Sequence, residues 1–443
     1  MSAEQTFAEL LKRVGQRRRA RVNGLLGLGL AHAALSMARA RPVVLVTRSA
    51  GVDELTRDLR FLAGANAARV LCLPADDRTP YHASSPDPLV VMERAATLHK
   101  VASGVPFDVL VLPAESACRR GLPFARLQKM AELIVAGEDL DRGALQKKLA
   151  VGGYNTVNTV EDPGSFAVRG GIVDIFWAGA ERPVRIDLFG DTIDTIKPFD
   201  PTNQRTVAGT EIAELSIGPA REVQLDDETV ACARRKLRDL ADHVEFPTKK
   251  LRELVEDLDH RVPFFGIEGL LPAFYETLET PLQLLEHSLG ADGFTVLLDD
   301  PGGVRGALDA LRADFEEHRR QAIGRGDLCF AVDDFLLDTD SFMGALREAP
   351  LIEHDPLPGA DDEVLELRTP ATVELRQEIL RETLRTDGGD AHSLLVPLVR
   401  RIQEQRQKGR VVLLPTASLG GVERLRDLLR AHHLEARACK EAP

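Results

Sequence analysis

The stretch PVVLVTRS at Pro42–Ser49 decides the fold class of this 443-residue chain. Its apolar run followed by polar residues is typical of a strand that is buried on both faces. Working outward, similar runs occur at 68–77 (ARVLCLPADD) and 107–116 (FDVLVLPAES), and the stretch at 87–102 (DPLVVMERAATLHKVA) between them is helical in pattern. Because strands that alternate with helices form parallel βαβ units, we expect an α/β domain over residues 1–130.

The composition is that of a soluble globular protein, with 44% hydrophobic and 28% charged residues. The length allows about three domains. The formal net charge of −13 repels phosphate backbones. Five widely spaced cysteines without a C-x-x-C pair predict no zinc site and favour a reducing cytoplasm. The sequence predicts no signal peptide and no membrane segment.

A glycine-rich stretch, GLLGLGLA at Gly24–Ala31, precedes the first of these runs. Gly24 and Gly29 have the spacing of the phosphate-binding loop G-x-x-x-x-G-K-[ST]. Leu30 stands in place of the lysine that holds the phosphates, and Ala31 in place of the hydroxyl that holds magnesium. The stretch is therefore either a nucleotide site that has lost its chemistry or only a glycine-rich helix start.

Other candidate sites give weaker signals. The run FTVLLDDP at 294–301 resembles a strand ending in magnesium-binding carboxylates, Asp299 and Asp300, but without the lysine these have no phosphate to serve. The basic run Arg17–Arg21 is either the solvated end of an N-terminal helix or a nucleic-acid contact. No aromatic residue interleaves with it, which disfavours base stacking. Scattered histidines predict no metal site.

The pattern changes between residues 140 and 207. A helical stretch ends at a double glycine and is followed by short extended runs, which predict a small α+β module with an antiparallel sheet. Gly190 and Asp191 are a plausible hairpin turn between two of these runs.

Within this module, the run PVRIDLFGD at 183–191 alternates between two faces. The core face carries Val184, Ile186 and Leu188, and the outward face carries Arg185, Asp187 and Phe189. An arginine and a phenylalanine on an open face are typical of a protein interface. The alternative is a phenylalanine packed beneath the neighbouring hairpin.

Beyond residue 220, long charged helices dominate, and three prolines in EAPLIEHDPLPGADD at 348–362 indicate a linker. The last segment, 409–443, repeats the strand–helix pattern and stops after what should be a second strand. We therefore expect the chain to be part of a longer protein.

The segment Tyr154–Thr206 resembles the UvrA-interaction domain that the excision-repair protein UvrB shares with the transcription-repair coupling factors, the Mfd family. It carries G-x-[FY]-x-x-RG-x-hh-D-hF (h, hydrophobic), then hRh-[DE]-hF, then FD-P-x-[ST]-QR with Asn203 in place of the Ser or Thr. Residues 74–88, 264–275 and Gly24–Ala31 resemble the coupling factors more than UvrB, which keeps a working GKT loop and a DNA-gripping β-hairpin for which this chain has no room.

This resemblance implies an α/β multidomain fold. A degenerate RecA/UvrB-like P-loop domain would lie in two parts, at 1–130 and 218–345, with an inserted α+β UvrA-interaction domain at 131–217. Residues 346–443 would be a linker and a partial α/β domain.

The resemblance also implies a function, which is to dock UvrA and so link stalled RNA polymerase to nucleotide excision repair. The family's contacts with UvrA, two arginines and a phenylalanine, fall on Arg169, Arg185 and Phe189. Gly190 departs from the acidic residue that is common next to them. The intact protein would be an ATP-dependent DNA translocase of the bacterial cytoplasm that displaces RNA polymerase.

ATP, Mg²⁺, RNA polymerase and duplex DNA would be bound by domains beyond Pro443, so no catalytic residue, cofactor or metal is expected in this chain. One alternative is a UvrB-like ATPase or helicase, which Leu30 disfavours. Another is a nucleic-acid-binding protein, which the net charge disfavours.

Overall fold

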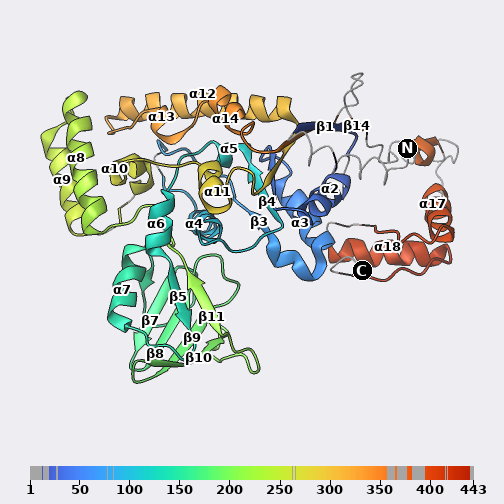
Figure 1. Cartoon of the computed structure of the whole chain (residues 1–443), viewed down its shortest axis with the longest axis horizontal. Coiled ribbons are helices and arrows are strands. Elements are labelled where there is room, and N and C mark those ends of the chain that lie inside the picture. The colour runs from blue at the N-terminus through green and yellow to red at the C-terminus, as the bar shows by residue number, and fades with distance from the viewer. Residues whose placement is uncertain are drawn as a thin grey trace.

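The computed structural model describes residues 12, 19–25, 28–76, 78–82, 84–261, 263–264, 266–356, 365–366, 377–381, 395–414, 416 and 418–439. Figure 1 shows a parallel sheet with its helices, a module (residues 132–217) below it, and two helical pairs at opposite ends of the molecule.

A seven-stranded sheet, parallel throughout, forms the centre of the chain, in the order β14-β1-β13-β12-β2-β4-β3. The strands are β1 (Arg19–Asn23), β2 (Val43–Thr47), β3 (Val70–Cys72), β4 (Val109–Pro113), β12 (Thr295–Asp299), β13 (Leu351–Asp355) and β14 (Leu365–Glu366). Every residue of β2 and β4 is buried, because helices cover both faces of the sheet. The predicted α/β class, with strands at 42–49, 68–77, 107–116 and 294–301, is confirmed.

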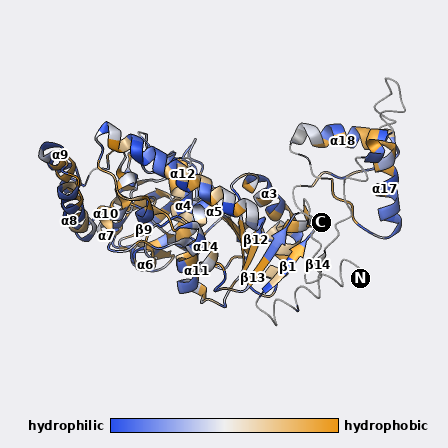
Figure 2. Cartoon of the chain, turned by 90° about the horizontal axis from the view of Figure 1, so that it is seen from above, coloured by the Kyte–Doolittle hydropathy of each residue, from blue (hydrophilic) through white to orange (hydrophobic). Residues whose placement is uncertain are grey.

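Twelve described helices belong to this part of the chain. They are α2 (Leu28–Ala38), α3 (Val52–Ala63), α4 (Pro88–Ala102), α5 (Ala114–Ala117), α6 (Phe124–Met130), α8 (Asp227–His243), α9 (Thr248–Asp259), α10 (Leu271–Phe274), α11 (Pro281–Leu289), α12 (Pro301–Arg325), α13 (Val332–Phe335) and α14 (Thr339–Ala345). Helices α2 and α3 pack with one face of the sheet, while α4, α5, α11 and α12 share the larger apolar core on the other face. In Figure 2, hydrophobic residues colour much of β12 and β13.

The sheet is assembled from two parts of the sequence. Strands β1 to β4 come from residues 19–113 and β12 to β14 from residues 295–366, and the module lies between them in the chain. Strand β12 pairs with β2, so the second part enters the middle of the sheet rather than its edge. Because both parts of the sequence contribute strands to one sheet, the apolar core of that sheet is continuous although the module is inserted between the two parts.

Strand β1 corrects the interpretation of the basic run at 17–21. Arg19 and Arg21 lie in a strand, not at a helix end, and β1 makes the run at Pro42–Ser49 the second strand of the sheet rather than the first. Arg21 pairs with Glu353 at 3.2 Å, and Arg19 donates to the carbonyl of Arg347. Residues 17 and 18 lie outside the described residues.

Strand β13 corrects the linker prediction at 348–362. Leu351–Asp355 lies inside the sheet, between β1 and β12, so this part of the segment is core and not a connection. The remainder from 357 to 362 lies outside the described residues.

The C-terminal segment contains α17 (Val396–Gln407) and α18 (Leu419–Ala431), which pack on each other through Val399, Ile402 and Leu429. They lie at the opposite end of the molecule from α8 and α9 in both views (Figures 1 and 2). The predicted helix after residue 418 is confirmed. The strands predicted on either side of it are wrong, since the described residues 410–414 and 434–439 form none.

The module is α+β, as predicted. One sheet has the order β10-β9-β8-β7-β6, antiparallel except for the β6–β7 pair, and a second pairs β5 with β11. The elements are β5 (Glu132–Val135), α7 (Arg142–Val151), β6 (Asn155–Thr156), β7 (Ser165–Arg169), β8 (Ile172–Phe176), β9 (Val184–Phe189), β10 (Thr192–Pro198) and β11 (Glu214–Ile217). The predicted turn at Gly190 and Asp191 joins β9 to β10, and Gly190 has the φ of +69° that this turn needs.

Helix α4 holds the module against the parallel sheet. Met92, Ala96 and His99 lie on the face of α4 that meets the module, where they contact Gly164, Gly179 and Gly218. A Cβ atom at any of these glycines would overlap the α4 side chain that it faces. Burial lowers the pKa of His99 to about 4, so the ring is neutral at pH 7, and its Nε2 lies 3.1 Å from Ser216 Oγ.

The segment that returns from the module is fixed by a buried cation. Arg94 of α4 donates to the carbonyl of Pro74 at 2.8 Å and lies within 3.4 Å of Asp76 and Glu222. Its side chain is 2% exposed, so these groups take the place of the water that would surround an exposed arginine. Packing and buried charge therefore attach the module to the parallel sheet. They hold the outer face of the module in a fixed position relative to that sheet.

Candidate functional site

The three residues that the sequence singled out lie together on one sheet of the module. Arg169 ends β7, and Arg185 and Phe189 lie on β9. Strand β8 lies between them and pairs with both. Arg185 and Phe189 share a face because they are four positions apart on the strand, an even number, which is about 13 Å at ~3.3 Å per residue.

Phe189 is the most exposed large hydrophobic residue in the described part of the chain, at 88%. The alternative interpretation, a phenylalanine packed beneath the neighbouring hairpin, is therefore wrong. Val184 and Ile186, on the opposite face of β9, are fully buried against α7 and the rest of the module core. The alternation in the sequence therefore assigns the buried and the exposed face of β9 correctly.

The backbone that carries Phe189 is held on several sides. Arg142 of α7 donates to the carbonyl of Gly170 at 2.8 Å and to Asp191 at 3.0 Å, so it joins the tips of the β7–β8 and β9–β10 hairpins. Thr192, which pairs with Phe189, also donates its hydroxyl to Asp139 at 2.6 Å. An apolar side chain on a rigid hairpin loses little conformational entropy on binding, which favours a docking role.

Arg185 is less open than the sequence predicts. Its side chain is 18% exposed, and its Nε and Nη2 donate to the two oxygens of Asp174 at 2.8 and 2.9 Å. Nη1 donates to the carbonyl of Gln204 at 3.3 Å, and the guanidinium lies 4.9 Å from the ring centroid of Phe199. The hydrogen bonds to Asp174 raise the pKa of Arg185 above its ordinary value.

Arg169 is held by the same carboxylate. Its Nη2 donates to Asp174 and its Nη1 to the carbonyl of Asn158, while about half of its side chain stays exposed. Asp174 itself has no exposed side-chain surface. One buried carboxylate therefore joins both arginines of the candidate surface, which we define as Arg169, Arg185 and Phe189.

The sequence analysis did not assign Asp174 a role. It stands in the run Ile172–Phe176, where a single acidic residue interrupts an apolar strand, and this interruption was the available signal. Its partner could not be found from the pattern, because the register that places Asp174 opposite Arg185 joins residues eleven positions apart on separate strands.

The glycine-rich loop has the surroundings of a phosphate-binding loop. It follows strand β1 and leads into α2, so the strand–loop–helix order is complete, although residues 26 and 27 lie outside the described residues. Leu30 is 8% exposed and Ala31 fully buried, and both pack in the apolar core between α2 and the sheet. Leu30 and Ala31 are thus part of the packing of α2.

The carboxylates at the end of β12 have protein partners. Asp299 accepts a hydrogen bond from the Thr47 hydroxyl at 2.9 Å and lies 2.7 Å from Nδ1 of buried His354. Asp300 caps α12 through the backbone N–H of Gly303 and pairs with Arg48 at 3.3 Å. These contacts tie strands β2, β12 and β13 together at the edge where nucleotides bind in such sheets.

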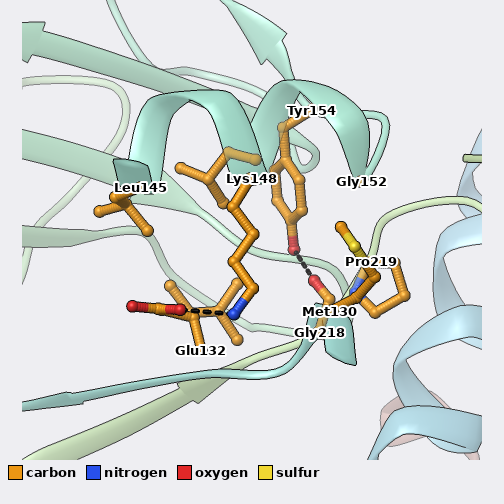
Figure 3. Close-up of a pocket in the computed structure, with 10 residues that line it drawn as sticks. Met130, Glu132, Leu145, Lys148, Gly152, Tyr154, Gly218 and Pro219 are labelled. Atoms are coloured by element: carbon orange, nitrogen blue, oxygen red, sulfur yellow. Dashed lines mark hydrogen bonds and ion pairs between the residues drawn. The ribbon is translucent and has the colours of Figure 1, made fainter. Parts of the chain in front are cut away.

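A small pocket lies at the base of the module, between β5, α7 and β11. It is lined by Met130, Glu132, Leu145, Lys148, Leu149, Gly152, Tyr154, Ile217, Gly218 and Pro219. Its polar groups are already paired, since Lys148 contacts Glu132 at 2.6 Å and the Tyr154 hydroxyl donates to the Gly218 carbonyl at 2.8 Å (Figure 3). The first pair fastens α7 to β5, and the second joins the segment that follows α7 to the residue after β11.

Among the described residues, no group of three or more His, Cys, Asp or Glu side chains is placed to hold a metal ion. In the same residues, no helix combines the length and the apolar character that crossing a membrane requires.

Comparisons with known proteins agree with this arrangement. A family model of the UvrB interaction domain matches residues 133–223. A transcription-repair-coupling factor from Myxococcus xanthus is 34% identical over 432 residues, which are 96% of this chain and 35% of that protein. A transcription-repair-coupling factor from Escherichia coli K12 is 25% identical over 379 residues, which are 79% of this chain and 32% of that protein. The resemblance seen in the sequence is confirmed, and the chain spans about a third of the length of these two relatives.

Proposed function

Because the chain carries a UvrB interaction domain and is similar along nearly its whole length to a transcription-repair-coupling factor, we propose that it docks the excision-repair protein UvrA. The observation that carries this proposal is the exposed Phe189 on a rigid hairpin, beside Arg169 and Arg185. Aromatic and arginine residues are the usual anchors of protein interfaces. Titration of purified UvrA with the chain, alone and in competition with UvrB, tests the proposal.

The docking surface defines a role in the intact protein. We place the chain in a bacterial cytoplasmic factor that brings UvrA to stalled RNA polymerase, since its cysteines are free thiols that suit a reducing compartment. In this proposal the ATP-dependent translocase, with its Mg²⁺, and the contacts with RNA polymerase and duplex DNA belong to regions outside these 443 residues. The chain itself contributes recognition and no chemical step.

The second candidate function is a UvrB-like ATPase, which the strand–loop–helix order at Gly24–Ala31 favours. We expect the chain to show no specific ATP binding and no ATP turnover, because Leu30 and Ala31 supply neither charge nor hydroxyl and are buried in the core. Isothermal titration with ATP and Mg²⁺ measures this. Micromolar binding, or DNA-stimulated hydrolysis that a change at Gly29 abolishes, would instead favour the ATPase.

A third candidate function is nucleic-acid binding. We expect the chain to bind a short DNA duplex only weakly at ~150 mM salt, because its net charge is −13 and Arg21 is paired with Glu353. Fluorescence anisotropy over a salt series measures the affinity. A submicromolar dissociation constant at that salt concentration would show that a basic face outweighs the overall charge.

A further inference from the structure

The buried carboxylate of Asp174 lies beneath both arginines of the candidate surface and faces no solvent. We infer that Asp174 is a positioning residue for docking: it orders Arg169 and Arg185 so that they present a fixed pair of cations beside Phe189. This inference rests on the proposed function, because it concerns how the same surface is built.

The register of β7, β8 and β9 is sufficient to bring Asp174 and the two arginines together. Asp174 on β8 pairs with Arg185 on β9 and with Ala167 on β7, and Arg169 lies two residues beyond Ala167 on the same face. Directly opposite and diagonal neighbours are the positions where side chains of a sheet interact. The carboxylate thus accepts three charge-assisted hydrogen bonds, two from Arg185 and one from Arg169.

Each arginine keeps donors for a partner. A guanidinium has five N–H groups. Arg185 donates three hydrogen bonds and Arg169 two to the described residues of the module. Asp187, the other carboxylate on this face, accepts a hydrogen bond from Thr195, so the remaining N–H groups of the arginines can donate to an anion of the partner. The partner it fits carries a carboxylate next to an apolar recess that accepts the Phe189 ring.

A long arginine side chain that is free in solution must be ordered when it binds, and this ordering lowers the affinity. Asp174 and the ring of Phe199 hold Arg185 in one orientation before any partner arrives. Removing the carboxylate should therefore weaken docking even though Asp174 has no surface to offer a partner.

The test compares variants of the whole chain in titrations against purified UvrA. We expect Asp174→Asn to weaken binding at least about tenfold. The control is Asp108→Asn, the same change at a carboxylate that holds an arginine, Arg69, outside the module, and it should leave binding unchanged. Adding Asp174→Asn to the double variant Arg169→Ala/Arg185→Ala should cause no further loss, because Asp174 acts only through the arginines. That triple variant should also melt at a higher temperature than the double variant, which keeps an unpaired buried carboxylate.

An NMR signature separates positioning from a purely structural role. In chain labelled with ¹⁵N-arginine, the Nε–H signal of Arg185 should move toward the position of free arginine in Asp174→Asn. The backbone N–H signals of the module's other arginines, such as Arg142, should keep their wild-type positions. If Asp174→Asn does not fold, Asp174→Glu, which keeps the charge but moves the carboxylate by one methylene group, takes its place. Weaker binding together with a shifted Arg185 Nε–H signal supports positioning, and wild-type binding with that shift overturns it.

The outcomes distinguish the two proposals. Wild-type affinity of a normally melting Asp174→Asn overturns the positioning role, as does a further loss in the triple variant. If Phe189→Ala and the double arginine variant also bind UvrA like wild type, then the docking surface itself is wrong. If those variants lose binding and Asp174→Asn does not, only the positioning role is wrong.

Discussion

Replacing Phe189 with alanine is expected to weaken binding to UvrA by about 30- to 1,000-fold, the equivalent of ~2–4 kcal/mol, without changing the melting temperature. The ring is 88% exposed, so its removal costs the folded chain almost no packing. On binding, the same ring would leave water entirely and exclude water from the arginines beside it. Isothermal titration of UvrA with wild type and Phe189→Ala measures the difference.

The control for this change is Leu133→Ala, which truncates another exposed apolar side chain in the module. Leu133 is 61% exposed and lies on β5, which belongs to the other, two-stranded sheet. Its loss should leave UvrA binding as it is. Equal losses in both variants would indicate a general apolar attraction, and wild-type binding of a normally melting Phe189→Ala would remove Phe189 from the interface.

The central strands of the parallel sheet could be predicted from sequence because their pattern is local. Strands β2, β4 and β12 are short runs rich in valine and leucine that helices cover on both sides, and such runs bounded by polar residues are typical of buried parallel strands. The hairpin β9–β10 was equally local, since alternation and the Gly190–Asp191 turn define it.

Strands β1 and β13 could not be predicted because their polar residues are satisfied by distant partners. RARVN and LIEHD read as charged segments, yet Arg21 pairs with Glu353 and His354 contacts Asp299 once the strands lie side by side. The first of these contacts joins residues 332 positions apart. A pattern read along the chain contains no trace of such a pairing, so the arginines looked like a solvated end and the prolines around β13 like a linker.

The candidate site shows the same limit at smaller scale. Alternation along β9 placed Arg185 and Phe189 on the outward face, which the structure confirms. It could not show that Arg185 is mostly covered, because the covering groups, Asp174, Gln204 and Phe199, come from three other segments. The sequence therefore identified the outward face of β9. The register of the sheet was needed to show that the ring of Phe189 is open on this face while Asp174 holds the two arginines beside it.

The second large effect concerns the opposite face of the same strand. Replacing Ile186 with alanine is expected to destabilise the module by about 2–5 kcal/mol, because the side chain is fully buried among Val173, Ile196 and their neighbours and its loss leaves a cavity. The chain's single tryptophan, Trp177, packs against this core, so its fluorescence during urea unfolding reports the module itself. Ile186→Val, which removes one methylene group, should cost only about 0.5–1.5 kcal/mol.

At temperatures where Ile186→Ala remains folded, it should bind UvrA like wild type, since Ile186 faces away from Phe189. An Ile186→Ala variant that unfolds like wild type and yet fails to bind UvrA would mean that the two faces of β9 have been assigned the wrong way round.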